Sequence, residues 1–545
     1  MELIGVVLSM LVAVVASGVF VRLIPLTVPT PLIQIGLGAV IAAVPSLPDV
    51  HLAPDVFFLL FLPPLLFLDG WRIPKEGLLH DRGLILQLAF GLVIFTVLGM
   101  GVLIHWMIPP MPYPVAFALA AIVSPTDPVA VSAISQRVPM PKRVMHVLEG
   151  ESLLNDASGL VCFRFAVAAA LTGTFSLSAA AVTFLKLVLF GIAAGVALTF
   201  GVVWVKNWIS ARLGEEAGSQ VLISLLIPFA AYQLAEHIGA SGILAAVSAG
   251  ITMSYSELSG RSLASTRVQR TAVWDTVQFA LNGMMFVLLG EQLPRILSGA
   301  VQVVRDANHL NPWWLAIYAL AINLGLACAR FIWVWVSVTL SRYLARRRGE
   351  PAMGRPSVRL TAAVSVAGVR GAITLAGVLT VPLTLSDGTP FPVRDLMIFL
   401  AAAVIIVSLL AASIGLPRLL IGLAMPADSG DEEERYRARN IAAKAAIQAI
   451  ERSAHEMASA DGAADVYAEA AARVMDSYRR RFEGEMTAER AAEVRRSNEI
   501  ERALRLAGLA AEREALFMLA RSEALTQENS RRLIRDVDLM EERLR

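Results

Sequence analysis

The sequence is poor in cysteine and in charge. Two of its 545 residues are cysteine, too few for a disulfide framework. Asp, Glu, Lys and Arg make up only 17% of the chain, against about 25% in soluble proteins, and the mean hydropathy is +0.63. These values exclude an ordinary soluble globule, a secreted disulfide scaffold and a disordered chain. The net charge of +2 provides no concentrated basic surface for nucleic acid.

The charges that are present lie mostly at one end. Residues 428–545 carry 46 of them, as many as residues 1–427. The sequence therefore predicts a membrane domain over 1–425 and a polar tail over 426–545. Ala, Glu, Arg and Leu dominate the tail and favour helix. The tail has no phosphate loop, metal-ligand spacing or nucleophile triad, so it is expected to be either a solubilising appendage or a regulatory or dimer-supporting segment.

Thirteen apolar runs are candidates for membrane helices, which need about 20 residues each. The predicted fold is an all-α polytopic membrane protein with a helical cytoplasmic tail. Alternate connections hold eighteen Lys and Arg residues and the remaining connections hold three, so the positive-inside rule places the N-terminus outside and the tail in the cytoplasm. The predicted spans are 2–22, 31–45, 53–71, 84–106, 113–137, 143–172, 177–206, 218–238, 241–256, 273–293, 312–341, 358–383 and 393–424.

The fifth span is interrupted by Ser124-Pro125-Thr126-Asp127-Pro128. Two prolines three residues apart remove two backbone donors and disfavour helix before each of them. Non-helical backbone is tolerated at membrane depth only where it is buried in protein or lines a watery cavity. The segment predicts a broken helix, with Asp127 beside a half-helix N-terminus that favours a carboxylate. The alternative is a simple proline kink with a structural Asp.

The sixth span contains acidic and polar residues where lipid-facing helices have none. Ser152 and Asp156 are four residues apart and share one helix face, and Glu151 and Asn155 share the adjoining face. Charge inside a membrane is costly and marks a transport pathway in most cases. Carboxylate, hydroxyl and amide oxygens suit a hard cation such as sodium. A buried polar interface between two helices is the alternative.

Two further arginines lie deep in apolar spans. Arg370 stands in the glycine-dense stretch Gly368–Gly377, which suggests a second broken helix, as transporters place them in corresponding repeats. Close packing through small residues is the alternative. Arg330 is alone in a long span and needs an acidic partner, for which Glu151 is the natural candidate; a watery vestibule without a fixed partner is the other possibility.

Taken together, these motifs resemble the monovalent cation:proton antiporters, and more narrowly their bacterial sodium/proton exchanger branch. The resemblance covers about residues 1–425 and includes Pro63-Pro64-Leu65-Leu66 in the third span. It implies thirteen helices, two inverted repeats of six, two broken helices that cross near the midplane, and a homodimer whose core domains move against a dimerisation domain. The motifs that carry it are Ser124-Pro125-Thr126-Asp127-Pro128, Glu151-Ser152-Leu153-Leu154-Asn155-Asp156 and Gly368-Val369-Arg370-Gly371-Ala372.

The resemblance also implies roles for individual residues. Asp156 would bind a cation and a proton in turn, within a cation- and proton-binding set that includes Asn155. Because Asn155 is neutral where electrogenic relatives have a second Asp, one proton per cation is expected. The remaining implied roles are cation ligation by Thr126 and Ser152, compensation of half-helix charge by Asp127 and Arg370, and a structural ion pair of Glu151 and Arg330.

One position departs from the family pattern. Many relatives have an acid directly after the Pro-Pro-x-x-x stretch, where this chain has Leu68, and its acid is Asp69. A shift of one residue turns a helical side chain by about 100°. A contribution of Asp69 to the ion site is therefore left open.

The predicted function is exchange of sodium or lithium for protons across a bacterial inner membrane, electroneutral and by alternating access, in the service of pH homeostasis and sodium tolerance. A potassium/proton or mixed sodium/potassium-proton antiporter is the alternative, and a cation channel or membrane sensor is a more distant one. An enzyme is not expected, because the deep acids have no nucleophile–base pair or metal set beside them. No cofactor is expected, and the partners are monovalent cations, protons and membrane lipid.

Overall fold

The structure is a computed structural model in which the chain forms two compact units, Met1–Leu423 and Ala424–Arg545. It describes residues 2–544 with the following exceptions: 24–27, 44–53, 73–81, 128–141, 173–176, 258–262, 307–312, 348–356, 386–387, 422–428, 462–463, 480–487 and 523–526.

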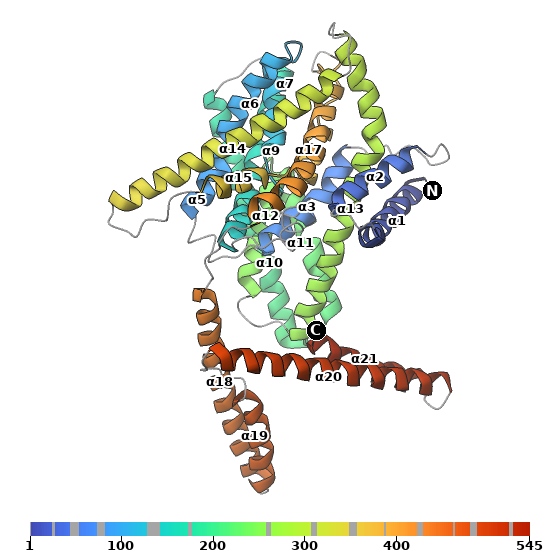
Figure 1. The fold of residues 1–545 in the computed structure, drawn as a ribbon, viewed down its shortest axis with the longest axis vertical. Helices are drawn as coiled ribbons and strands as arrows, with labels where there is room; N and C mark the ends of the chain where they lie inside the picture. The colour runs from blue at the N-terminus through green and yellow to red at the C-terminus, as the bar shows by residue number, and fades with distance from the viewer. Residues whose placement is uncertain are drawn as a thin grey trace. The chain divides into compact units, whose positions relative to one another are not determined.

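Helices build the first unit (Figure 1), and every one of the thirteen predicted segments contains helix. In the described part of the chain, eight helices are long and apolar enough to cross a membrane, which indicates a multi-pass membrane protein. The number of thirteen crossings and the inverted repeats stay predictions. The helices are α1 (Glu2–Leu23), α2 (Thr30–Ala42), α3 (Pro54–Arg72), α5 (Arg82–Leu86), η1 (Gln87–Leu92), α6 (Val93–Met107), α7 (Tyr113–Val123), α9 (Lys142–Thr172), α10 (Leu177–Leu213), α11 (Ala217–His237), α12 (Gly242–Glu257), α13 (Ala264–Asp306), α14 (Trp313–Arg347), α15 (Val358–Val366), α16 (Ala372–Leu379) and α17 (Arg394–Leu420).

The helices of this unit fall into two groups. The panel group consists of α1–α3 and α10–α13. Within it, α2 packs on α13, and α12 packs on α3 and α10. The core group consists of α5, η1, α6, α7, α9 and α14–α17. Within it, α7 packs on α6 and α9, and α17 packs on α14 and α15 and also on α13 of the panel group. Glycine allows α3 and α12 to approach closely, because a Cβ on Gly250 would collide with the carbonyl oxygen of Phe67. Small residues at the contact are typical of helix packing in membranes.

Two helices are interrupted at the same place. Helix α7 ends at Val123, and residues 124–127 continue without helix, as expected of the prolines there. Five residues, 367–371, separate the end of α15 from the start of α16. The backbone N–H of Asp127 donates to the carbonyl of Val369 at 2.7 Å, so the two interruptions touch. The predicted continuation of the first broken helix to residue 137 lies outside the described residues.

A π-helical turn, η1, lies within the helix that α5 begins and α6 ends. Such a turn departs from the regular α-helical bonding pattern and frees backbone groups for other partners. Ser158 Oγ donates to the carbonyl of Ala89 at 2.7 Å, and Trp333 Nε1 donates to the carbonyl of Gln87 at 3.1 Å. Because these side chains belong to α9 and α14, they tie η1 to both helices.

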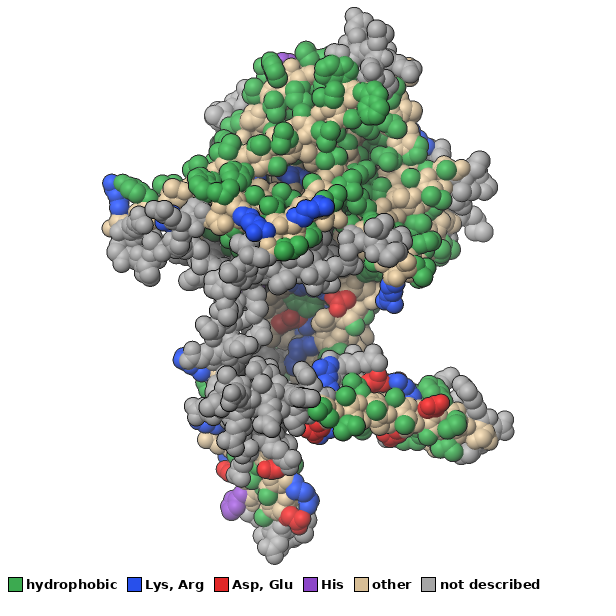
Figure 2. Space-filling view, viewed as in Figure 1, with side chains coloured by type: hydrophobic (Ala, Val, Ile, Leu, Met, Phe, Trp, Pro, Cys, Tyr) green, Lys and Arg blue, Asp and Glu red, His purple; other side chains and the backbone are tan. Residues whose placement is uncertain are grey.

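The described residues of the second unit form four helices: α18 (Ser429–Asp461), α19 (Ala464–Arg479), α20 (Ala488–Arg521) and α21 (Gln527–Leu544). They pack in consecutive pairs, α18 with α19 and α20 with α21. Arg513 of α20 donates to Asp538, at 3.2 Å, and to Glu541 of α21, and these hydrogen bonds raise the pKa of its guanidinium. Acidic and basic side chains alternate along the surface of the tail helices, whereas hydrophobic side chains cover much of the visible face of the first unit (Figure 2).

Candidate ion-binding site

Asp156 lies on α9 beside the crossing of the two interruptions. Its side chain is buried, with 4% of the residue exposed, and it borders a cavity of about 30 Å³. A cavity holds a water molecule once it offers about 10–15 Å³, so this one has room for a small ion or one or two waters. Its walls come from α3, α9, α13, α16 and the break after α7. They are Leu65, Asp69, Pro125, Thr126, Asp127, Ser152, Asp156, Gln278, Asn282, Gly371, Ile373 and Thr374.

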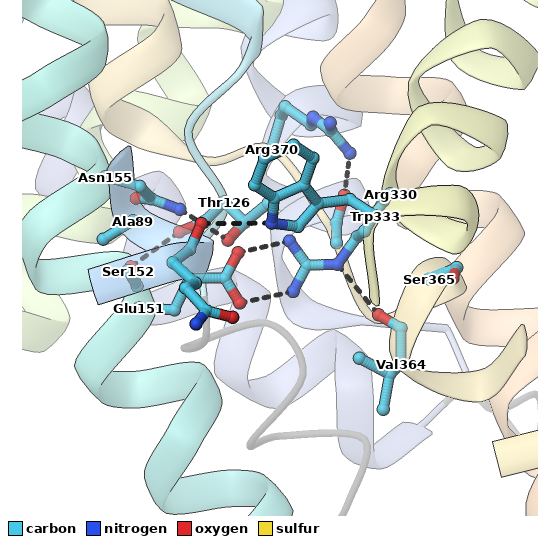
Figure 3. Close-up of polar contacts among 12 residues, drawn as sticks. Ala89, Thr126, Glu151, Ser152, Asn155, Arg330, Trp333, Val364, Ser365 and Arg370 are labelled. Carbon is cyan, nitrogen blue, oxygen red and sulfur yellow. Dashed lines mark hydrogen bonds and ion pairs between the residues drawn. The ribbon is translucent and has the colours of Figure 1, made fainter. Parts of the chain in front are cut away.

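Two polar side chains of α9 fasten this helix to the first interruption. Ser152 Oγ donates to the carbonyl of Thr126 at 2.6 Å, and Asn155 Nδ2 donates to Thr126 Oγ1 at 3.0 Å. Figure 3 shows both side chains directed toward Thr126. The structure places Asn155 behind Thr126 rather than in the cavity wall, so its amide positions a wall residue. Its Oδ1 atom is buried without a hydrogen-bond partner in the described part of the chain.

Charged side chains stand at the two half-helix ends that meet in the crossing. Arg370 Nε donates to the carbonyl of Val123, the last residue of α7, at 2.8 Å, and its Nη1 donates to the carbonyl of Gly368. The Asp127 carboxylate lies against Gly371, the residue that caps the N-terminus of α16. A cation at a helix C-terminus and an anion at an N-terminus are the signs that the helix dipoles favour.

Glu151 and Arg330 form a buried bidentate ion pair between α9 and α14 (Figure 3). Arg330 Nη2 donates to Glu151 Oε2 at 2.7 Å, and Nη1 donates to the other carboxylate oxygen at 2.5 Å. Arg330 Nε donates to the carbonyl of Val364 in α15 at 3.0 Å. The side chains are 3% and 0% exposed for Arg330 and Glu151, so their charges are satisfied only by these contacts. Through Arg330, Glu151 therefore helps to hold α9, α14 and α15 together.

Asp156 contrasts with Glu151 because, within the described residues, no side chain or backbone group donates a hydrogen bond to it. A buried carboxylate without a partner is costly unless it takes up a proton or a cation. Thr126 and Ser152, which carry hydroxyl and carbonyl oxygens, belong to the same wall. Oxygen atoms around one carboxylate suit a hard monovalent cation, and the carboxylate itself is a proton acceptor.

Asp69 belongs to this cavity as well. The residue that takes the family's usual acidic position, Leu68, is fully buried in helix packing, whereas Asp69 is in the cavity wall. The shifted acid thus lines the same cavity as Asp156 and Asp127, and its contribution to an ion site stays a prediction. Three carboxylic side chains thus share the wall of one small cavity.

Two wall residues were not singled out from the sequence. Gln278 and Asn282 of α13 line the cavity opposite the α9 side chains. They are four residues apart, one helical turn, and so share a face. A pair of amides with this spacing in an apolar helix was the available signal. Gln278 Oε1 also accepts a hydrogen bond from Arg72 Nη1 at 2.7 Å.

Comparison with known proteins agrees with this architecture. Residues 7–422 match the family described as sodium/hydrogen exchanger, transmembrane. The uncharacterized Na(+)/H(+) exchanger YjcE of Escherichia coli is 40% identical over 99% of this chain and 98% of its own length. A sodium, potassium, lithium and rubidium/H(+) antiporter of Bacillus pumilus is 44% identical over 77% of this chain and 61% of its own length.

A solved structure supports the fold of the membrane unit. The sodium proton antiporter MjNhaP1 of Methanocaldococcus jannaschii superposes with a TM-score of 0.56 at 19% identity, covering 78% of this chain and 99% of its own. At that identity the likeness concerns the fold alone. From the family match over most of the chain and the relatives at 40% identity or more, this protein belongs to the transmembrane sodium/hydrogen exchanger family.

Proposed function

We propose that this protein exchanges sodium or lithium for protons, one for one, at Asp156. The observation that carries the proposal is the state of this carboxylate: it is buried, it borders a cavity of ion size, and no described residue pairs with it. A proton and a cation each neutralise the same charge, so the carboxylate holds one or the other. The family's transport of cations against protons is consistent with such a site.

Cation ligation in this proposal uses oxygen atoms that already line the cavity. Thr126 and Ser152 contribute hydroxyl or carbonyl oxygens next to Asp156, and hard cations prefer oxygen ligands. Asn155 acts one step removed, by orienting the Thr126 hydroxyl. Asp127 and Arg370 keep the half-helix ends electrostatically balanced while the cavity changes its occupant.

Alternating access follows from the cost of moving an uncompensated charge. With Asp156 neutralised, the core group moves past the panel group; with a bare carboxylate, desolvation holds it back. A second cavity of about 510 Å³ supports this mechanism. It is bordered by Leu160 and Phe163, which continue the Asp156 face of α9, so a hydrophobic layer separates the two cavities. Arg164 of α9 and Glu236 of α11 pair at 3.2 Å beside it and join the two groups.

A stoichiometry of one proton per cation is proposed because Asn155 is a neutral amide. Asp69 is the residue that tests it, since a second titrating carboxylate in the cavity would allow two protons per cycle. A transport rate that does not depend on the membrane potential supports one-for-one exchange, and a rate that the potential drives contradicts it.

Potassium/proton or mixed exchange is the second candidate. The observation that favours it is that two Bacillus relatives, at 44% and 43% identity, are sodium, potassium, lithium and rubidium/H(+) antiporters. Ion choice depends on cavity size and ligand number, and a cavity with room for one or two waters also admits a bare potassium ion, which is about the size of a water molecule. A channel or a sensor has no comparable support.

The proposed setting is the inner membrane of a bacterium, with a homodimer as the working unit. The asymmetry of Lys and Arg between connections supports an external N-terminus and a cytoplasmic tail. Roles in pH homeostasis and sodium tolerance belong to the same proposal.

Proton flux in everted membrane vesicles tests the function. Sodium, lithium, potassium and rubidium chlorides are added across a pH series to vesicles with the native protein or with Asp156→Asn. The proposal expects sodium- and lithium-driven flux that the substitution abolishes, at an unchanged protein level and melting temperature. Larger flux with potassium and rubidium selects the second candidate, and cation-driven flux that survives in Asp156→Asn refutes the assignment of the site.

A further inference from the structure

Arg72 is a positive charge that is hydrogen-bonded to Gln278, a residue of the cavity wall. It is the last residue of α3, three positions after Asp69. Residues three apart on a helix are neighbours on one face, so the guanidinium belongs to the side of α3 that presents Asp69 to the cavity. Arg72 itself is not among the wall residues.

Two residues of α13 hold Arg72 in its present position. Its Nη2 pairs with Asp275, and its Nη1 donates to Gln278 Oε1 at 2.7 Å. Asp275 and Gln278 are three residues apart, and Gln278 continues into the cavity wall. The guanidinium is therefore one side chain away from the carboxylates.

The ion pair between Arg72 and Asp275 contributes little to the stability of the fold. Its significance therefore lies in where it holds the Arg72 guanidinium. The Arg72 and Asp275 side chains are 38% and 58% exposed, and ion pairs this exposed contribute about 0–1 kcal/mol. The wall of the nearby cavity contains the carboxyl groups of Asp69, Asp127 and Asp156, which attract a cation when they are ionised. A guanidinium tethered to the same helix as Asp69 has a high effective concentration there.

We propose that Asp275 and Gln278 are positioning residues that keep Arg72 from entering the cavity as a tethered competitor of the transported cation. When Arg72 is held by α13, the mouth of the cavity stays open and its charge is compensated. When it is released, its guanidinium turns toward Asp69 and opposes cation entry. This inference rests on the proposed function, because it assumes that the cavity at Asp156 binds the transported cation.

The experiment compares Asp275→Asn, Arg72→Gln and the double variant by sodium-driven proton flux in everted vesicles, at fixed pH and with choline chloride to keep ionic strength constant. Asp275→Asn is expected to raise the KM for sodium by about threefold to fivefold, the factor that corresponds to the free energy of an exposed ion pair. The maximal rate is expected to change little. Arg72→Gln and the double variant are expected to share a KM at or below the native value. Asp275→Glu, which retains the acceptor, is expected to keep the native KM.

A second measurement reports binding without transport. Sodium that binds the folded state raises the melting temperature of the purified protein, because the stabilisation grows as RT ln(1 + c/Kd) with the sodium concentration c. Asp275→Asn should shift the sodium concentration at which this stabilisation sets in to a higher value, and the added Arg72→Gln should reverse the shift. Where Asp275→Asn does not fold, Gln278→Leu replaces it, with a smaller rise in KM that Arg72→Gln also reverses.

A double variant as impaired as Asp275→Asn overturns the inference, because it shows that Asp275 attracts the cation directly and not through Arg72. A KM unchanged in Asp275→Asn and Gln278→Leu overturns it as well. Asp156→Asn separates the two proposals: if it abolishes cation-driven flux while the Asp275 and Arg72 variants behave like the native protein, only the inference about Arg72 fails.

Discussion

Arg370 donates from its Nε to the carbonyl oxygen of Val123 at 2.8 Å. This single contact joins the second broken helix to the C-terminus of the first half-helix, 247 residues away in the chain. It places a permanent positive charge where a helix dipole is negative. On the other side of the crossing, the Asp127 carboxylate lies at the N-terminus of α16. The charges at the crossing thus compensate one another, and Asp156, which lines the neighbouring cavity, takes no part in this compensation.

The Glu151–Arg330 pair predicts a strong non-additive effect on stability. Glu151→Gln or Arg330→Met alone leaves one buried charge without its partner, which costs about 3–5 kcal/mol. The double variant removes both charges and should recover most of this loss. Melting temperatures of the purified protein in detergent measure the effect. Arg164→Gln is the matched control, since its pair with Glu236 is exposed and contributes about 1 kcal/mol or less. Equal losses in the single and double variants would contradict the interpretation.

Thr126 and Ser152 predict a change in cation affinity without loss of the fold. Thr126→Val removes the hydroxyl that accepts from Asn155, and Ser152→Ala removes the donor to the carbonyl of Thr126. Each loses one hydrogen bond near the cavity, about 0.5–1.5 kcal/mol, so the KM for sodium should rise about two- to tenfold. Vesicle flux over a sodium series measures it. A Leu160→Ile control, which changes shape beyond the cavity, should leave the KM within about twofold of the native value, and unchanged KM values for Thr126→Val and Ser152→Ala would remove both residues from the site.

Asp69 decides the stoichiometry. In proteoliposomes with a clamped membrane potential, exchange at Asp156 alone predicts equal sodium flux at all potentials, both in the native protein and in Asp69→Asn. The substitution should instead change the KM, because it removes one of the three carboxyl groups that line the cavity. A native protein driven by the potential, together with an Asp69→Asn variant that is not, would identify Asp69 as a second proton carrier.

Gly371→Ala tests the crossing itself. A Cβ at this position would meet the Asp127 carboxylate, and the break between α15 and α16 leaves no neighbouring turn to absorb the displacement. We expect a loss of transport together with about 1–3 kcal/mol of stability, the usual cost of forced overpacking. Flux and melting temperature measure the two effects. Gly99→Ala in α6, where a Cβ meets open space, is the control and should be silent.

Competition at one carboxylate also predicts a pH dependence of the KM. Where protons occupy Asp156 most of the time, each unit by which the pH falls should raise the KM for sodium about tenfold, because one proton is displaced per cation. Two displaced protons would raise it about a hundredfold. A series of KM values from pH 6 to pH 9 distinguishes the slopes, and a KM independent of pH over this range would contradict competition.

Much of this protein could be inferred from local sequence, because in a membrane the local rules are strict. Apolar runs locate the helices, since every backbone group in lipid must be bonded within a helix. Pro125 and the glycines around Arg370 mark the interruptions for the same reason, and the cost of a lone buried Arg330 points to Glu151. Helices α10 and α13 extend beyond the predicted spans 177–206 and 273–293, because the charged residues next to the apolar runs also favour helix.

The composition of the cavity could not be inferred in this way, because it depends on how α3, α9 and α13 are rotated against one another. Rotation follows from packing of residues far apart in the chain, such as the close contact of Gly250 with Phe67 that orients α3. That contact turns Leu68 inward and Asp69 toward Asp156. It also brings Arg72 to Asp275, 203 positions along the chain. Spacing along one helix therefore indicated which residues share a face, and the packing between helices settled what each face meets.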